Sequence, residues 1–391
     1  MAGQFRTHGQ QTALAVVERA VASEHPPHAL LLSGPPRVGK TTLALDLFAG
    51  LLCLAEPPTA RPCRACLACR KVESGTHPDV HRLAPEGTGG QIRIGQVQAL
   101  SAELALLPLE GRCRMAVIEQ AQRLNPDSQN ALLKLLEEPP ARVTIVLAAD
   151  EPSGLLPTVI SRCARVRLGP VAPSAIAQIL AQRSGLDALR GEQIGRQSGG
   201  MVGLALDLAA RPELLLARGR VVRTLLDLVV ADRRTRLGAA AGLIADGTEL
   251  AAGAAGTDTA GPEAAEEAAD STSGRGSRAT APRRPVRSAA RAAPAERRAA
   301  VRAVIDIWRD LARDLALAGR GATAELRQRD LIDELLVVGR IVEPSAVARF
   351  VERLDGIGRA IEAYANPELV LDALLLEWPH ATGESGHGQA A

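Results

Sequence analysis

The feature that most constrains this chain is a glycine-rich loop between an apolar run and a helical stretch. Residues 30–45 read LLLSGPPRVGKTTLAL, which fits the pattern G-x4-G-K-[ST] without a mismatch. In such a loop the glycines let backbone N–H groups surround phosphate oxygens, the lysine reaches the terminal phosphates, and the hydroxyl ligates magnesium. A strand-to-helix turn that no longer binds nucleotide is the alternative. The candidate residues for binding ATP and Mg²⁺ are Gly34, Gly39, Lys40, Thr41 and Thr42.

Short apolar runs alternate with helical stretches around this loop. This alternation predicts an α/β P-loop domain over residues 1–170, with a parallel sheet and helices on its faces. The expected strands are Ala29–Ser33, Met115–Ile118, Val143–Ala148 and Val166–Leu168.

The remainder of the chain shows only helical periodicity or none. Residues 171–246 read as a small helical lid, and residues 299–381 as an all-α domain. Between them, residues 247–298 are rich in Ala, Gly and Pro and contain no Leu, Ile, Phe, Trp or Tyr after Leu250. Such a segment cannot offset the entropy of ordering, so we expect a disordered linker. Residues 382–391 are expected to form a loose tail.

Charge and composition exclude several classes of protein. The 46 basic and 44 acidic residues leave a net charge of +2, so no whole-molecule field attracts nucleic acid or acidic lipid. The six aromatic residues are too scattered for the stacking platform of single-strand binders. No signal peptide and no run of 18 apolar residues is found, which predicts a cytoplasmic protein without a membrane segment.

Four cysteines cluster just after the helix that follows the glycine-rich loop. In a reducing compartment such a cluster indicates metal binding rather than disulfides. Four thiolates complete the tetrahedral shell of a structural Zn²⁺, which would staple the loop 53–69 and perform no chemistry. The candidate ligands, spaced C-x9-C-x2-C-x2-C, are Cys53, Cys63, Cys66 and Cys69.

Other interpretations of the cysteines stay open. An iron–sulfur cluster would require a further cysteine where Glu73 stands. Unliganded thiols are possible, and His77 or His81 are possible stand-in ligands. Cys113 and Cys163 are expected to be lone buried thiols.

Two further positions bear on nucleotide chemistry. Hydrolysis requires carboxylates that hold the metal and orient the attacking water. Glu119 can supply a metal-side carboxylate, but the next residue, Gln120, is a neutral amide that cannot accept a proton. This predicts binding without efficient turnover. Arg162, in Ser-Arg-Cys, is either an ordinary surface arginine or a guanidinium presented to a neighbouring subunit's triphosphate.

Several segments, in this order, resemble bacterial clamp-loader subunits of the AAA+ class, and among these the delta-prime kind of DNA polymerase III. They are HALLLSGPPRVGKTT, the four-cysteine insert, QIRIGQVQALSAELALLPLEGRCRMAVIEQA, NALLKLLEEPP and LLPTVISRC. The last two are specific, whereas the glycine-rich loop alone is not. The resemblance covers residues 4–210 and is vague for the helical C-terminus.

The resemblance implies an AAA+ domain, a lid and a collar domain that joins a hetero-oligomeric ring. The implied partners are gamma/tau and delta subunits, and, through the complex, the sliding clamp and primed DNA. The delta-prime member of that family is a stator that lends its SRC arginine, here Arg162, to a neighbouring subunit's ATP. The family's zinc pattern corresponds to the four cysteines of the 53–69 loop.

Three departures from hydrolysing relatives point to a subunit with weak or absent ATPase activity. Those relatives carry an Asp-Glu pair at Glu119-Gln120, a polar sensor at Ala148-Ala149, and a lid arginine at Leu204. We therefore expect a largely non-hydrolysing stator. The alternatives are a gamma/tau-type ATPase motor and an unrelated P-loop NTPase.

Overall fold

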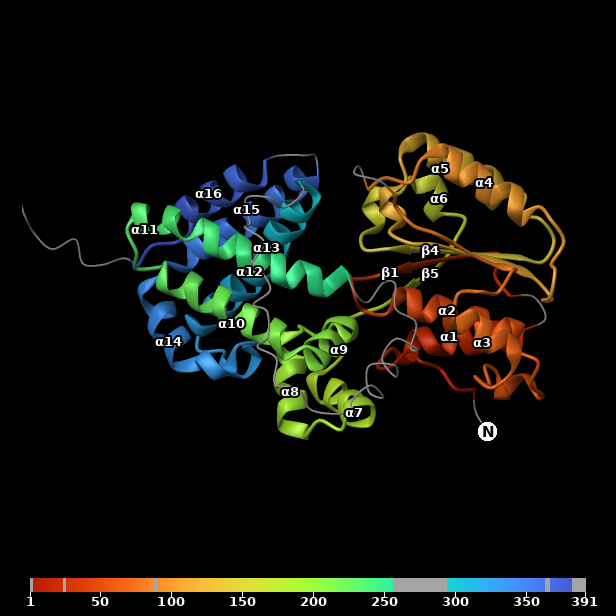
Figure 1. Ribbon diagram of the computed structural model, residues 1–391, viewed down its shortest axis with the longest axis horizontal. Coiled ribbons are helices and arrows are strands. Elements are labelled where there is room, and N and C mark those ends of the chain that lie inside the picture. The colour runs from red at the N-terminus through yellow and green to blue at the C-terminus, as the bar shows by residue number, and fades with distance from the viewer. Residues whose placement is uncertain (1–2, 24–25, 87–89, 256–293, 363–365, 382–391) are drawn as a thin grey trace, which may run out of the picture. The chain divides into compact units, whose positions relative to one another are not determined.

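The computed structural model of the chain describes residues 3–23, 26–86, 90–255, 294–362 and 366–381 (Figure 1). Two compact units are present, Met1–Gly191 with Ser198–Ala205, and Glu192–Gln197 with Leu206–Ala391. Most of the expected linker and the whole of the expected tail lie outside the described residues.

The first unit contains a five-stranded parallel sheet with the order β2-β3-β4-β1-β5. The strands are β1 (Ala29–Ser33), β2 (Val80–Leu83), β3 (Arg114–Ile118), β4 (Val143–Ala149) and β5 (Ala164–Arg167). Strands β1, β3 and β4 are buried on both faces, as parallel strands between helical layers must be. The α/β P-loop fold predicted from the sequence is confirmed.

Helices cover both faces of this sheet (Figure 1). They are α1 (Gln11–Ala22), α2 (Lys40–Leu52), α3 (Leu67–Glu73), α4 (Ile94–Leu104), α5 (Pro126–Glu137) and α6 (Pro157–Ile160). Side chains alternate along the strands, so Leu30 and Leu32 pack with α1, α2 and α3, whereas Ala29 and Leu31 pack with α4, α5 and α6. Two apolar layers therefore fix the strand ends that carry the candidate site.

Two edge strands differ from the prediction. Strand β2, Val80–Leu83, was not predicted because its four residues include the polar His81 and Arg82, a pattern typical of a half-exposed edge strand. Strand β5 runs from Ala164 to Arg167 rather than over 166–168, since its pairing with β1 begins at Ala164.

The boundary expected at residue 246 is also placed differently. Helices α7 (Pro173–Ser184), α8 (Ala188–Gln197) and α9 (Val202–Ala210) follow the sheet domain. The next three, α10 (Pro212–Asp227), α11 (Arg233–Gly238) and α12 (Ala240–Ala255), belong to the C-terminal unit, whose apolar core includes Val221, Leu225 and Leu243. Periodicity identified these helices correctly, but it does not say which core a helix joins.

The C-terminal unit is all-helical, as predicted. Its other helices are α13 (Pro294–Ala318), α14 (Ile332–Ile341), α15 (Pro344–Glu362) and α16 (Pro367–Glu377). The core centres on Trp308, whose ring lies 5.2 Å from that of Phe350 and 5.4 Å from that of Trp378. Such tilted aromatic contacts stabilise the packing of α13, α15 and the end of α16.

Both ends of the expected linker are helical, which corrects its predicted limits of 247 and 298. Helix α12 continues to Ala255, and α13 begins at Pro294. Alanine has the highest helix propensity, so an alanine-rich end extends a helix once it finds a packing surface. Gly247 provides that surface by lying against the backbone of Ala300, where a side chain would not fit.

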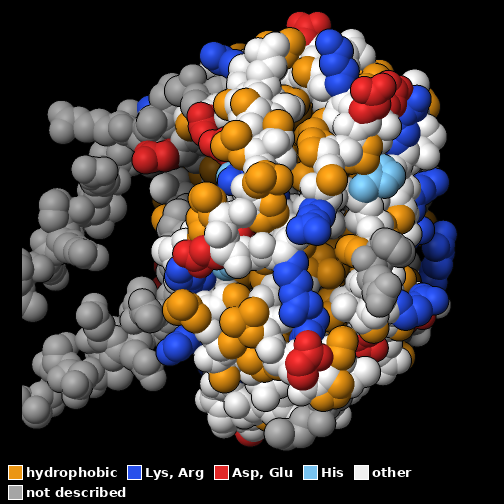
Figure 2. Space-filling model, turned by 90° about the vertical axis from the view of Figure 1, so that its right-hand side faces the viewer, with side chains coloured by type: hydrophobic (Ala, Val, Ile, Leu, Met, Phe, Trp, Pro, Cys, Tyr) orange, Lys and Arg blue, Asp and Glu red, His pale blue; other side chains and the backbone are white. Residues whose placement is uncertain are grey.

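The surface charges and the apolar character of the helices concern two classes of protein considered above, nucleic-acid binders and membrane proteins. On the face shown in Figure 2, basic side chains are interspersed with acidic and hydrophobic ones, in keeping with the near-neutral net charge. Among the helices of the described ranges, none combines the length and the apolar character required to cross a membrane.

Candidate functional site

The glycine-rich loop is held by contacts that only glycine permits. At Gly34, φ is +150°, and a Cβ atom would lie 2.2 Å from the carbonyl oxygen of Leu168. Its N–H group donates to the carbonyl of Ala149 at the end of β4. Gly39 has φ of +107° and forms the N-cap of α2. The loop is thus fixed between the ends of two strands and a helix N-terminus, the geometry that binds anions.

Lys40 is the first residue of α2 and is only 8% exposed. Its Nζ atom donates to the carbonyls of Gly34 at 2.8 Å and Pro35 at 2.7 Å, and to Asp150 Oδ1 at 2.7 Å. Thr41 and Thr42 follow in the first turn and are half-buried. The predicted cradle residues are therefore assembled, with the lysine folded back onto the loop.

Asp150, which directly follows β4, is the site residue that sequence reasoning missed. Its Oδ2 atom accepts a hydrogen bond from Gln122 Nε2 at 3.0 Å, and its N–H group donates to Gln122 Oε1 at 3.1 Å. The available signal was an acid at the carboxyl end of a strand beside β1, where ligand-contacting residues of parallel sheets gather.

Glu119 is engaged away from this lysine. It follows β3, and its Oε1 atom accepts hydrogen bonds from Arg82 Nε at 3.0 Å and Nη2 at 2.6 Å. The next residue, Gln120, is exposed and adopts a left-handed conformation with φ of +48°. The acidic partner of Lys40 in the structure is thus Asp150 and not Glu119.

The first turn of α9 contacts the tip of the glycine-rich loop. The N–H group of Gly203 donates to the carbonyl of Arg37 at 2.9 Å, and a Cβ atom at Gly203 would lie 3.0 Å from that oxygen. Leu204, which stands where hydrolysing relatives of the resembled family carry an arginine, is half-buried beside it. Ala148 and Ala149, which the resemblance places where hydrolysing relatives carry a polar sensor, are buried within β4.

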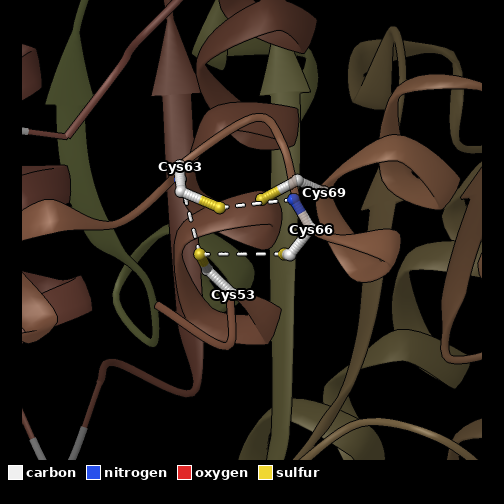
Figure 3. Close-up of side chains that lie close together, drawn as sticks. All are labelled: Cys53, Cys63, Cys66 and Cys69. Atoms are coloured by element: carbon white, nitrogen blue, oxygen red, sulfur yellow. Dashed lines mark hydrogen bonds between the residues drawn. The ribbon is translucent and has the colours of Figure 1, made fainter. Parts of the chain in front are cut away.

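The four cysteines of the 53–69 loop come together (Figure 3). Their sulfur atoms all lie within 4.8 Å of one another, and Cys66 Sγ is 4.0 Å from Cys53 Sγ. Cys53 ends α2, Cys66 is the N-cap of α3, and Cys69 lies inside α3. This group could hold a metal ion, and it would join the end of the glycine-rich loop's helix to α3.

Backbone N–H groups point at these sulfur atoms. Cys53 Sγ accepts from the N–H groups of Ala55 and Cys63, and Cys63 Sγ from that of Cys66, each at 3.4 Å. Burial acts to raise the pKa of Cys63, but these and neighbouring hydrogen bonds outweigh it and lower that pKa to about 6. Burial raises the pKa of Cys53 and of Cys69. Four thiolates at this spacing would repel one another, so the fully deprotonated form of the group is favoured only with a bound cation.

A buried carboxylate connects this loop to α2. Asp46, in the middle of α2, is 1% exposed and forms an ion pair with Arg64, which lies between Cys63 and Cys66. It also accepts hydrogen bonds from the N–H group and the hydroxyl of Thr7, at 2.8 and 2.6 Å. The cysteine loop and the N-terminal segment are therefore fixed to the same carboxylate.

The stand-in histidines are engaged elsewhere. His77 Nδ1 accepts from the N–H group of Asp79 at 3.2 Å, and His81 Nδ1 lies 2.8 Å from Glu103. Cys113 and Cys163 lie outside the four-cysteine group, and burial raises the pKa of each to about 11. Cys163 is buried, as expected, whereas Cys113 is only partly buried.

Arg162 lies just after α6 and is partly accessible. Its side chain is 35% exposed, Nη2 lies 2.6 Å from Glu137 Oε1 at the end of α5, and Nη1 donates to the carbonyl of Thr158 at 2.9 Å. The Glu137 side chain is itself 48% exposed. This arrangement orients the guanidinium without enclosing it, so both readings of Arg162 fit the geometry.

Comparison with known proteins gives matches concentrated on the first unit. Residues 9–172 match the family model described as DNA polymerase III, delta subunit. The DNA polymerase III subunit delta' of Bacillus subtilis (strain 168) is 34% identical over 174 residues, 44% of this chain and 52% of that protein. The subunit delta' of Pseudomonas aeruginosa is 41% identical over 136 residues, 35% of this chain and 41% of that protein.

A third relative bears a different name. The DNA polymerase III subunit tau of Salmonella typhimurium is 34% identical over 160 residues, 41% of this chain and 24% of that protein. The chain spans about half the length, or less, of the curated relatives it matches. The sheet order, the glycine-rich loop and these matches agree, and residues 9–172 are similar to the clamp-loader subunits of DNA polymerase III.

Proposed function

We propose that this chain is a delta-prime-like subunit of the DNA polymerase III clamp loader, a largely non-hydrolysing stator. In this role it assembles with gamma/tau and delta subunits through its helical C-terminal unit and its AAA+ domain. The complex places the sliding clamp on primed DNA, and Arg162 contacts the triphosphate bound by a neighbouring ATPase subunit. The relatives named delta' support this assignment.

One observation carries the non-hydrolysing part of the proposal. The chain keeps the phosphate cradle around Lys40, but the carboxylate that follows β3 is paired with Arg82 and is followed by a neutral amide. An attacking water is activated by a carboxylate that accepts its proton, and a neutral amide cannot accept one. A cradle without that carboxylate favours binding over turnover.

The metal proposed for the four cysteines is a structural Zn²⁺. Zinc bound to four thiolates, at a Zn–S distance of about 2.3 Å, implies sulfur atoms about 3.8 Å apart, which is close to the observed spacing. Two thiols with x2 spacing beside a helix N-terminus are typical of such sites. When bound, the ion supplies only cross-linking of α2 to α3, since four protein ligands leave it no open position.

A gamma/tau-type motor is the second candidate, because the glycine-rich loop is intact and a tau subunit is 34% identical over 160 residues. The position of Glu119 argues against this second candidate. In a motor, the acid after β3 would contact the metal at the phosphate site, whereas Glu119 contacts Arg82.

The proposal is tested by reconstitution. The full chain is co-expressed with the gamma/tau and delta subunits of the same cell, and clamp loading onto primed DNA is measured with and without it. We expect one stable complex that contains this chain, and loss of loading when it is omitted. A chain that elutes alone while the other subunits load the clamp at full rate would contradict the proposal.

A further inference from the structure

We propose that Asp150 is a built-in competitor for phosphate at Lys40, which weakens the binding of nucleoside triphosphates to this chain's own glycine-rich loop. The inference goes beyond the proposed function, since it concerns the loop of the isolated chain. It requires neither contact of Arg162 with a neighbouring subunit's triphosphate nor assembly into a complex.

Lys40 has no N–H donor left for a ligand. An ammonium group has three N–H donors, and Lys40 Nζ has three acceptors within 2.8 Å, namely two loop carbonyls and Asp150 Oδ1. A phosphate oxygen that reaches Nζ must replace one of them. The carboxylate is the charged acceptor of the three, so it occupies the position of highest affinity for an anion.

Asp150 is held in place independently of Lys40. Gln122 bonds both its carboxylate and its backbone N–H group, so the amide and the acid form a closed pair. Gln122 in turn packs closely against Gly154. A Cβ atom at position 154 would lie only 2.9 Å from the Cβ atom of Gln122. The carboxylate is therefore pre-positioned by the protein rather than recruited by the lysine.

The negative charge of Asp150 also opposes a triphosphate at Lys40. A triphosphate that contacts Lys40 brings its terminal oxygens next to the carboxylate, and two like charges at hydrogen-bonding distance from one cation repel. The Lys40 side chain is 9% exposed and that of Asp150 34% exposed, so water screens this repulsion only in part. Nucleotide binding then requires rotation of the Asp150 carboxylate away from Gln122, and the loss of those hydrogen bonds lowers affinity.

The test measures binding of Mg·ATP to the full chain by calorimetry. Asp150→Asn keeps the size of the side chain and removes its charge, and we expect it to bind Mg·ATP about tenfold more tightly than the unmodified chain, equivalent to about 1.4 kcal/mol. Glu151→Gln is the matched control, because this neighbouring acid is exposed, and its affinity should equal that of the unmodified chain. Adding Lys40→Ala to Asp150→Asn should abolish the gain.

Gln122→Ala provides a second, independent variant. It frees the carboxylate without removing it, and we expect tighter binding, by a smaller factor than for Asp150→Asn. Equal or weaker binding of Mg·ATP by the folded Asp150→Asn protein would overturn the proposal, as would an equal gain in Glu151→Gln. If Asp150→Asn does not fold, unchanged or weaker binding by Gln122→Ala overturns it. Failure here leaves reconstitution with the other subunits unaffected, so the two proposals are tested separately.

Discussion

Replacing Arg162 by alanine is expected to leave the subunits assembled and to suppress ATP hydrolysis at the one neighbouring site that this arginine serves. An arginine supplied in trans is worth about 10³–10⁵ in the rate of the site that it completes. The total DNA-stimulated ATPase rate of the complex falls by less, because the other sites keep their own arginines. Single-turnover measurement at the affected site, or clamp loading itself, shows the full effect.

The contacts of Arg162 favour such an exchange of partners. Its present partner, Glu137, is on the surface, and exposed ion pairs contribute about 0–1 kcal/mol. A desolvated phosphate group bound by both nitrogens of a guanidinium gains more than that. The ion pair with Glu137 therefore orients Arg162 without holding it back from a triphosphate.

The control for this prediction is Arg165→Ala. Arg165 is an exposed arginine on β5, three positions further along the chain, and its removal should change neither assembly nor ATPase rate. Unchanged ATPase in a complex that contains Arg162→Ala would remove this arginine from the proposed site and leave it an ordinary surface residue.

Removal of the metal is expected to have the second large effect. Purified protein should contain about one zinc ion per chain. Structural zinc sites bind with about 10–16 kcal/mol at neutral pH, and this energy contributes to folding. Chelation, or Cys66→Ser, should therefore release the ion, disorder the 53–69 loop and lower the melting temperature of the domain that contains the sheet.

The expected damage extends beyond the loop because of Asp46. Once Arg64 is released, this carboxylate loses its guanidinium partner while it stays inside the protein, 1% exposed. Removing one partner of a buried ion pair is strongly destabilising. Because Asp46 lies in α2, whose first residue is Lys40, metal loss should also weaken the phosphate cradle.

Cys113→Ser is the matched control for the metal prediction. Cys113 lies outside the four-cysteine group, so its replacement should leave the zinc content unchanged. Metal-free protein with the melting temperature and loop proteolysis pattern of the untreated chain would refute the structural role. A different bound metal would refute the assignment of zinc alone.

How far the sequence predicts this structure depends on how local each signal is. The glycine-rich loop and the cysteine spacing are local patterns, and the structure assembles both where they were expected. The pair of Lys40 and Asp150 was not predicted, because its members are 110 positions apart and meet only when β1 and β4 become neighbours. Sequence spacing carries no information about such a contact.

The wrong assignment of helices to the lid has the same cause, a packing partner that is distant in the sequence. The amphipathic pattern predicts that Val221 and Leu243 face an apolar surface, but it does not reveal that this surface is the core of Trp308 rather than that of a lid. Strand β2 escaped prediction because an edge strand needs few apolar residues. For the helices the sequence did not reveal the packing partner, and for β2 it did not reveal the element itself.

Steady-state ATP turnover by the purified full chain, without other subunits, decides between a stator and a motor. The rate should not exceed that of the Lys40→Ala variant prepared in the same way, because Gln120 cannot accept a proton and Glu119 is paired with Arg82. Sustained phosphate release that disappears in Lys40→Ala would contradict the stator and establish an ATPase motor.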